Sequence, residues 1–323
     1  DVIYHYRGHE VSKLFMYWAS LIAIAGVVKR EAYLVNGNGR LFTNLYLLIV
    51  GDSGSAKNTV TDFVKSMLDY FEHAVMEATS DEYIPEMKRV DAVTSGATRA
   101  GLQEAMKPAN KRGKKTITMR DAYGNPIMKK NGQIAEYFQT SEITIVQEEM
   151  SVFLNRQQFL DDLLPWLINM YDPKDREEVL TRNGGREEFR NILVNMVGNT
   201  TPVALKDTLP AGVQSDGFLS RCLLIYQSYT DHMFPDIRIP EMAPTQDDLK
   251  RNLGWIAATT FVQYDLTPEA KEWFTKWYEV KWNEGRASGV LAGLKSRHKV
   301  MIKKIAALIR WQRYERNDRL IHL

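Results

Sequence analysis

Short apolar runs of strand length alternate along the chain with longer stretches that suit helices. The runs lie at residues 45–50, 89–94, 143–147, 192–197 and 222–227, and the segments between them are long enough to cross over a sheet. Parallel strands require such crossovers, and their side chains are apolar on both faces because helices cover both. The pattern therefore predicts an α/β fold, a three-layer α/β/α core around a mostly parallel sheet.

A proline-punctuated stretch at residues 231–248 follows the last of these runs, and the pattern after it is helical. Thr267 and Pro268 suit the start of a helix, and the aromatic residues that follow recur at helical spacing, which is typical of a buried face. The expected organisation is an N-terminal helical segment (1–36), a core (37–234) with an insert (107–138) and a hairpin (178–189), and a C-terminal helical lid (245–323).

The most apolar window, residues 14–28, is shorter than the ~20 residues of a membrane-spanning helix. We expect a buried helix there and no membrane partner. Cys222 is the only cysteine, which excludes an intrachain disulfide and favours a reducing compartment such as the cytoplasm. The chain does not begin with Met, so we expect it to be part of a longer protein.

The formal net charge of +2 hides two strongly basic segments. Residues 107–130 hold eight Lys or Arg and one Asp, and residues 295–319 hold nine Lys or Arg and two acids. Concentrated positive charge on an otherwise acidic chain suggests contact with a polyanion such as DNA. Two solvated surface faces are the alternative. The candidate DNA-binding residues of the first segment are Lys111, Arg112, Lys114, Lys115, Lys129 and Lys130.

The segment NLYLLIVGDSGSAKNTVTDFVKSML combines an apolar strand, a glycine-containing loop and an amphipathic helix. This is the context of a P-loop, in which backbone N–H groups and a helix N-terminus surround phosphates and a lysine reaches the terminal ones. A glycine-rich turn with a surface lysine is the alternative. The candidate nucleotide-binding residues here are Gly51, Asp52, Ser53, Gly54, Ser55, Ala56, Lys57, Asn58 and Thr59.

Two positions depart from the P-loop pattern. Ala56 replaces a glycine, which costs little if its φ is negative. Asn58 replaces the Ser or Thr that ordinarily binds Mg²⁺, and an amide oxygen is a weaker ligand. Weak hydrolysis therefore remains an alternative to vigorous hydrolysis.

A second strand, in EITIVQEEM, ends in Glu148 and Glu149. In such a pair the first carboxylate orients Mg²⁺ or its water and the second polarises the attacking water. Strand-end acids are common, so this pair gains meaning only beside the P-loop. Together with one intervening strand, it indicates an ATPase of the additional-strand class, with Mg²⁺ expected at Asn58 and Glu148.

Two further polar residues stand at strand ends. Asn199 ends the strand of NILVNMVGNTTP, where ATPases of this class sense the γ-phosphate; a cap before Pro202 is the alternative. Arg221 opens the last strand, where ring ATPases project an arginine into the neighbouring subunit's nucleotide. A local pair with Asp216 is the alternative.

The segment EEVLTRNGGREEF predicts a hairpin with a turn at residues 183–185. Arg182 and Arg186 flank the turn. In superfamily-3 and MCM helicases a hairpin at this point grips the nucleic-acid backbone. A solvated hairpin explains the pattern equally well.

The ordered set of REAYLVNGNGRLFTNLYLLIVGDSGSAKN, VTSGATRAGLQEAM, ITIVQEEMSVFL, LINMYD, VGNTTPVALKD and DGFLSRCLLIY resembles the ATPase domain of phage- and plasmid-type primase-helicase proteins, which is placed among superfamily-3-like or AAA+ ring helicases. The similarity spans residues 10–315. It implies phosphate binding by Lys57, catalysis by Glu149, γ-phosphate sensing by Asn199 and a trans-acting Arg221. It also suggests a phosphate contact for Arg297, whose alternative is membership of the basic face.

The expectation from this resemblance is an ATP- and Mg²⁺-dependent ring helicase or translocase, hexameric, acting on single-stranded or forked DNA in a bacterial cytoplasm, with a primase module as a further partner. A nucleotide-gated DNA-binding or loader protein is the second hypothesis. A small-molecule kinase is the third, and it leaves Arg221 and the basic segments without a role.

Overall fold

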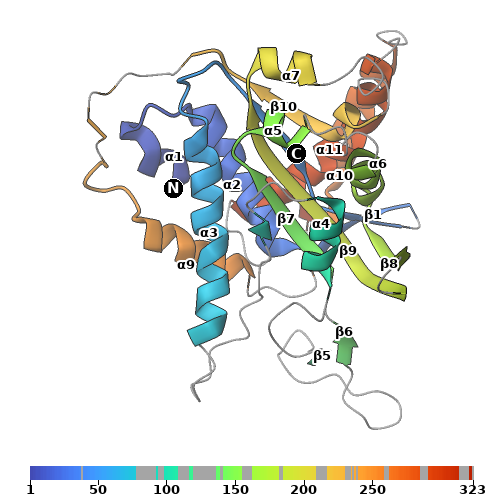
Figure 1. Cartoon of the computed structure of the whole chain (residues 1–323). Helices are drawn as coiled ribbons and strands as arrows, with labels where there is room; N and C mark the ends of the chain where they lie inside the picture. Colours follow the sequence, from blue (N-terminus) through green and yellow to red (C-terminus); the bar gives the residue numbers. More distant parts are fainter. Residues whose placement is uncertain are drawn as a thin grey trace.

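The computed structural model describes residues 1–37, 39–77, 92–93, 98–107, 116–118, 136–138, 141–154, 162–181, 185–208, 217–229, 234, 236–237, 239–257, 262–283, 290–312 and 320–321. These residues form an α/β structure around a central sheet (Figure 1).

The central sheet contains all five predicted strands. They are β3 (Tyr46–Val50), β4 (Ala92–Val93), β7 (Glu142–Gln147), β9 (Gly185–Thr200) and β10 (Cys222–Tyr226). The spatial order is β10-β3-β9-β7-β4, and every neighbouring pair in this order is parallel. The prediction of a mostly parallel sheet is confirmed. The strand that is fourth along the chain, β9, therefore lies between the first, β3, and the third, β7.

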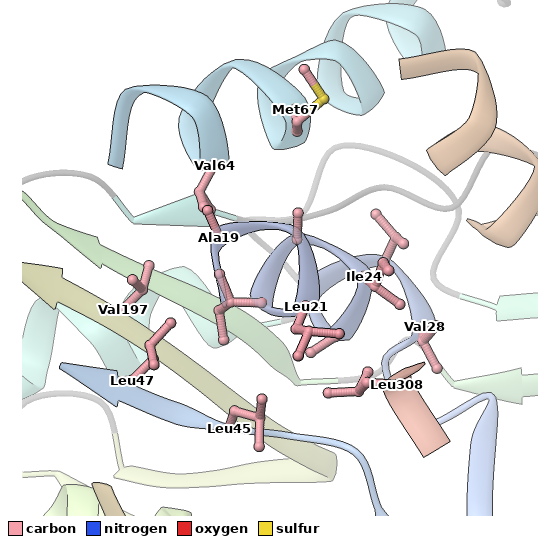
Figure 2. Close-up of a cluster of buried hydrophobic side chains, with 14 of the residues drawn as sticks. Ala19, Leu21, Ile24, Val28, Leu45, Leu47, Val64, Met67, Val197 and Leu308 are labelled. Atoms are coloured by element: carbon pink, nitrogen blue, oxygen red, sulfur yellow. The ribbon is translucent and has the colours of Figure 1, made fainter. Parts of the chain in front are cut away.

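One face of the sheet is covered by α2 (Lys13–Val28), α3 (Asn58–Glu77) and α11 (Val290–Gln312). Ser12 caps α2 by accepting a hydrogen bond from the N–H of Leu14, and most of the helix is buried, as predicted. Figure 2 shows α2 packed between α3 and the strands. The side chains that meet there are Ala19, Leu21, Ile24, Val28, Leu45, Leu47, Val64, Met67, Val197 and Leu308.

No helix within the described ranges is both long enough and apolar enough to cross a membrane. The buried segment at the N-terminus is thus a core helix of the α/β layer, with α3 and the sheet as its packing partners.

The opposite face of the sheet packs against α4 (Arg99–Met106), α5 (Met150–Leu154) and α6 (Leu164–Met170). Thr98 caps α4 by accepting from the N–H of Gly101. Leu48 and Ile145 point to this face, whereas their neighbours Leu47 and Val146 point to the other. Alternating burial on two covered faces explains why these strands are continuously apolar.

A second sheet joins segments from both ends of the chain. Its order is β12-β11-β1-β2, with β1 (Ala32–Asn36), β2 (Gly39–Phe42), β11 (Val262–Leu266) and β12 (Leu320–Ile321). β1 and β11 are parallel, with Ala32 opposite Val262. This sheet was not predicted: β1, β11 and β12 lie in segments expected to be helical, and β2 lies at the start of the predicted core.

The predicted hairpin at residues 178–189 is confirmed. β8 (Lys174–Thr181) runs antiparallel to the first part of β9, with Thr181 opposite Gly185. β9 continues without a break from this hairpin into the centre of the main sheet. Of the two candidate arginines, Arg182 and the side chain of Arg186 lie outside the described residues.

The remaining elements are α1 (Val2–His5), η1 (Tyr6–Gly8), α7 (Pro202–Thr208), η3 (Leu219–Arg221), α9 (Gln246–Ala257), α10 (Pro268–Asn283) and the antiparallel pair β5 (Thr116–Thr118) and β6 (Glu136–Phe138).

The expectation that the aromatic stripe of α10 is buried is wrong. Trp273 is 50% exposed and Val280 is also exposed, whereas Ala270 is buried on the same helix. The ammonium group of Lys303 lies 5.0 Å from the ring centroid of Phe274. The helix therefore docks through a small residue and keeps much of its aromatic face at the surface.

Candidate functional site

Residues 51–57 form a loop between the carboxyl end of β3 and the first turn of α3. Gly54 and Ala56 have positive φ, at +85° and +53°, while Ser55 between them does not. Alternating left- and right-handed residues turn successive backbone N–H groups toward one side and create a concavity that suits anions. The loop therefore contains two left-handed residues on either side of Ser55, a backbone pattern that also occurs in anion-binding turns.

Gly51 is needed because other backbone approaches it closely. A Cβ there would lie 2.6 Å from Ser55 Oγ and 2.9 Å from the carbonyl oxygen of Gln227, at the end of β10. The N–H of Gly51 donates to the carbonyl of Thr200 at 3.2 Å, which ties the loop to the end of β9. The loop is therefore held by both strands that neighbour β3.

The negative φ considered for Ala56 is not what the structure has. Its φ of +53° lies in the left-handed region, which costs an L-residue roughly 1–2 kcal/mol. The departure from glycine at this position stores strain in the loop.

Replacement of this alanine should therefore stabilise the protein. We expect Ala56→Gly to raise the free energy of unfolding by up to about 1 kcal/mol, since relief of strain exceeds the added entropy of glycine in the unfolded chain. Urea unfolding measures it. Ala105→Gly, inside α4, is the matched control and should lose about 1 kcal/mol. Equal losses in the two variants would contradict a strained Ala56.

The Lys57 side chain folds back over the loop. Its Nζ donates to the carbonyl of Asp52 at 2.6 Å and lies 3.3 Å from Ser55 Oγ. Burial lowers the pKa of Lys57, and the carboxylates of Glu149 and Asp52 oppose that shift. The buried Lys57 ammonium thus lies against the loop backbone, and the charge of Glu149 acts on it.

The two carboxylates after β7 have different partners. Glu148 forms an ion pair with Lys65 of α3. Glu149 accepts hydrogen bonds from the N–H and the Oγ of Ser151, at 3.2 and 2.7 Å, in the first turn of α5. The acidic pair diverges, and Glu149 is the member whose charge acts on Lys57.

Asn199 connects the end of β9 to the start of α3. Its Nδ2 donates to the carbonyl of Lys57 at 3.0 Å and to Thr61 Oγ1 at 3.2 Å, and lies 3.5 Å from Asn58 Oδ1. Its own Oδ1 is buried without a hydrogen-bond partner among the described residues. Asn199 therefore reaches the loop that holds Lys57, whereas Thr201 is the residue whose side chain caps α7.

Gly198 explains how the acidic pair comes close to the loop. A Cβ on Gly198 would lie 2.2 Å from Cγ of Met150, the residue after Glu149. β9 and β7 pair with Gly198 opposite Gln147. Gly198 was not among the predicted site residues, although a glycine within a continuously apolar strand is a recognised sign of close approach.

Arg221 and Arg297 lie together at the opposite edge of the sheet. Cys222, next to Arg221, pairs with Tyr46 at the start of β3, whereas the loop follows Val50 at its end. Both arginines lie near Asp172: Arg221 Nη2 is 3.9 Å from Oδ2, and Arg297 Nη1 is 3.8 Å from Oδ1. The structure does not bring Arg297 to the loop of its own chain.

The pairing of Arg221 with Asp216 lies outside the described residues. Within them, Arg221 Nη1 donates to the carbonyl of Gly217 at 2.9 Å. Also outside them are the candidates of the basic insert, namely Lys111, Arg112, Lys114, Lys115, Lys129 and Lys130.

Only some of the basic side chains of the second basic segment, residues 295–319, are exposed. Lys304 and Arg310 are buried, and Lys304 donates to the backbone and side-chain oxygens of Asn44 at 3.1 and 2.8 Å. The idea of a uniformly solvated basic face is therefore wrong for this part of α11, because the helix turns these two cations inward.

No group of three or more His, Cys, Asp or Glu side chains suited to a metal ion occurs within the described part of the chain. Residues near the loop that offer oxygen atoms include Asp52, Asn58, Glu148, Glu149 and Asn199.

The fold is thus that of an α/β protein with a mostly parallel sheet, the loop of residues 51–57 at the carboxyl edge and an arginine pair at the amino edge. No protein-family model matches the sequence, and none of the curated proteins compared with it gives a match.

Proposed function

We propose that this chain is an ATP-driven ring helicase or DNA translocase that serves the replication of a mobile element. The observation that carries the proposal is the strand order. β9, which carries Asn199 as its last residue but one, lies between β3, which the loop follows, and β7, which the acidic pair follows. That inserted strand is the defining feature of the additional-strand ATPases whose motifs the sequence resembles.

Three side chains have suitable positions for nucleotide hydrolysis. The N–H groups of the loop and the Lys57 ammonium bind the phosphates. Ser151 donates two hydrogen bonds to Glu149 Oε1 and so fixes the carboxylate. The carboxylate then accepts a proton from an attacking water. Asn199 links the strand end to the loop through the Lys57 carbonyl and orients that water relative to the phosphates.

The fit to Mg²⁺ is weaker than the fit to phosphate. Magnesium bound with a nucleotide needs only one or two protein oxygens, and when bound it neutralises phosphate charge. Asn58 Oδ1 stands at the first position of α3, near Asn199. Glu148 is engaged by Lys65 and has to leave that ion pair to reach a metal ion.

The arginine pair supports assembly. Arg221 lies about 13–17 Å from the loop of its own chain, given five β3 residues at about 3.3 Å each. It therefore suits a nucleotide bound to a neighbouring copy. The β8–β9 hairpin, which leads directly into the strand of Asn199, suits transmission of nucleotide state to DNA.

A nucleotide-gated DNA-binding or loader protein is the second candidate. The observation that favours it is the combination of Asn58 at the hydroxyl position with a Glu148 already paired to Lys65. This protein would bind ATP tightly and hydrolyse it slowly even with DNA. Asn58→Ser should then raise turnover, and unchanged turnover would count against a limiting Asn58.

Unwinding of forked DNA tests the main proposal. We expect strand separation that requires ATP and Mg²⁺, and loss of it in Lys57→Ala and in Glu149→Gln. Lys206→Ala, an exposed lysine of α7, is the matched control and should unwind normally. Unwinding that survives both site substitutions, or its absence in wild-type protein that assembles on ATP and DNA, would refute the helicase.

A further inference from the structure

Two guanidinium groups and the buried amino group of Lys304 gather around one carboxylate and one aromatic ring at the amino edge of the central sheet. We name Arg221, Arg297, Lys304, Tyr171 and Asp172 the Asp172 cluster. The cations come from η3 and α11, which pack together, and Tyr171 and Asp172 lie between α6 and β8. Segments far apart in sequence therefore converge on one carboxylate.

Positive charge exceeds negative charge among these side chains. Two guanidinium groups share Asp172, at 3.9 and 3.8 Å. Charge-assisted hydrogen bonds are about 2.7–2.9 Å long, so this carboxylate is close to both arginines without bonding tightly to either. Burial, followed by the nearby Arg297, lowers the pKa of Arg221, as expected where cations crowd together.

The two guanidinium groups are held side by side before any ligand arrives. Their Cζ atoms lie 5.9 and 5.4 Å from the ring centroid of Tyr171. Tyr171 is itself fixed, because its carbonyl accepts from Asn44 Nδ2 at 2.8 Å and Lys304 Nζ lies 4.4 Å from its ring. Two arginines held near one fixed ring form a preorganised cationic surface.

Exposure differs sharply between the carboxylate and the cations. The Asp172 side chain is 69% exposed, whereas Arg221 and Arg297 are 14% and 26% exposed. The Nε of Arg221 is buried and has no hydrogen-bond partner among the described residues. Asp172 is thus the most exposed of the three side chains, and an incoming anion would compete with it for the two arginines.

We propose that Arg221 and Arg297 together form a receptor for a phosphate-bearing anion, and that Asp172 occupies this receptor in the free chain and is displaced by the ligand. Each arginine offers several N–H donors, and a phosphate group offers more oxygen atoms and more negative charge than one carboxylate. Arg297 is then a partner of Arg221, and it does not contact the nucleotide of its own chain.

Two sources carry such a phosphate: a nucleotide held by the loop of a second copy, or the backbone or end of a DNA strand. The first source rests on the proposed function, since it requires a nucleotide in the neighbouring loop. The receptor itself does not, because its residues bind phosphate whatever the loop does.

Binding of inorganic tripolyphosphate to Lys57→Ala protein tests the receptor without the loop. Isothermal titration should still detect binding in this background. Adding Arg297→Gln should weaken it at least about tenfold, because one charge-assisted donor group is lost. Adding Asp172→Asn should tighten it several-fold. Arg251→Gln, a surface arginine of α9 paired with Asp248, is the matched control and should change nothing.

Weaker binding by Arg297→Gln could also come from a misfolded protein. The Asp172→Asn variant removes this ambiguity, because a misfolded protein would not bind tripolyphosphate more tightly. Unchanged affinity in both the Arg297→Gln and Asp172→Asn proteins, with native circular dichroism, would overturn the proposal. This result would leave ATP binding by the wild-type loop untouched, so failure of the receptor and failure of the proposed function are distinguishable.

Two further arms identify the source. If the phosphate comes from a neighbouring nucleotide, ATP should drive wild-type assembly in sedimentation, and Arg297→Gln should abolish it. If it comes from DNA, a 5′-phosphorylated single strand should bind the Lys57→Ala protein and lose affinity with Arg297→Gln. Dependence on Arg297 in either arm supports the receptor, and independence in both contradicts it.

Discussion

Lys57→Ala should abolish measurable ATP binding. In the structure the Lys57 ammonium is buried, donates to the Asp52 carbonyl and lies within reach of the Glu149 charge. A phosphate chain would replace the Asp52 carbonyl as its partner. A hydrogen bond to a charged group contributes about 1.5–3 kcal/mol, and two phosphate oxygens bound by one ammonium give a loss on the order of 100-fold or more.

Titration calorimetry with ATP and Mg²⁺ measures this loss. Lys206→Ala is again the control, because it removes an exposed lysine outside the loop. Lys57→Ala should have a urea midpoint close to that of the wild type, because the Lys57 ammonium contacts Asp52 and Ser55 of its own loop. Wild-type affinity in Lys57→Ala would mean that the loop does not bind the phosphates.

The stability of the protein should rise between pH 7 and 8.5 because of Lys304. Burial lowers the pKa of this lysine to about 7, with Asp172 opposing the shift and Arg297 adding to it. The unfolded chain keeps the Lys304 proton up to about pH 10.5, so in this window it binds more protons than the folded chain. Stability therefore increases with pH, by about 2 kcal/mol over 1.5 units at about 1.4 kcal/mol per unit.

The comparison that isolates this effect is wild type against Lys304→Met. The variant should lose most of the rise, while Lys303→Met, the neighbouring and less buried lysine, should retain it. The window ends near pH 8.5 because burial raises the pKa of Cys222 and of Tyr171, and unfolding at higher pH exposes groups that release protons. Parallel stability curves for wild type and Lys304→Met would contradict a neutral Lys304 above pH 7.

Local sequence patterns were sufficient to predict the central sheet and the loop. Each of the five strands contains a short apolar run, and β3 and β7 are buried throughout, so such runs are visible without knowledge of their partners. The hairpin before Asn199 was predictable for the same reason, since its turn residues are adjacent in sequence. These features depend on neighbours along the chain.

The second sheet was not predictable in this way. β1 pairs with β11, which lies more than 200 residues later in the sequence, with Ala32 opposite Val262. The sequence of neither strand indicates which strand it pairs with. Arg297 raises the same difficulty. Its position beside Asp172 depends on how α11 packs against η3, which is a tertiary fact.

The burial of Lys304 was predictable from helical periodicity. This lysine stands three residues after Met301 and four before Leu308, both buried on the inner side of α11. Lys304 was assigned to a basic surface because of its charge, although its spacing from Met301 and Leu308 indicates the buried side of the helix. For α10 the opposite error occurred, because aromatic residues at helical spacing were assigned to the core although they remain partly exposed.

The measurement that most directly tests the account is the steady-state rate of ATP hydrolysis, with and without forked DNA, for wild type and for Glu149→Gln. Glu149 is fixed by Ser151 beside the loop, and a general base contributes about 10²–10⁴-fold to the rate. We expect DNA-stimulated hydrolysis in the wild type and a fall of about 100-fold or more in Glu149→Gln, with ATP binding retained. DNA-stimulated hydrolysis at the wild-type rate in Glu149→Gln would contradict it.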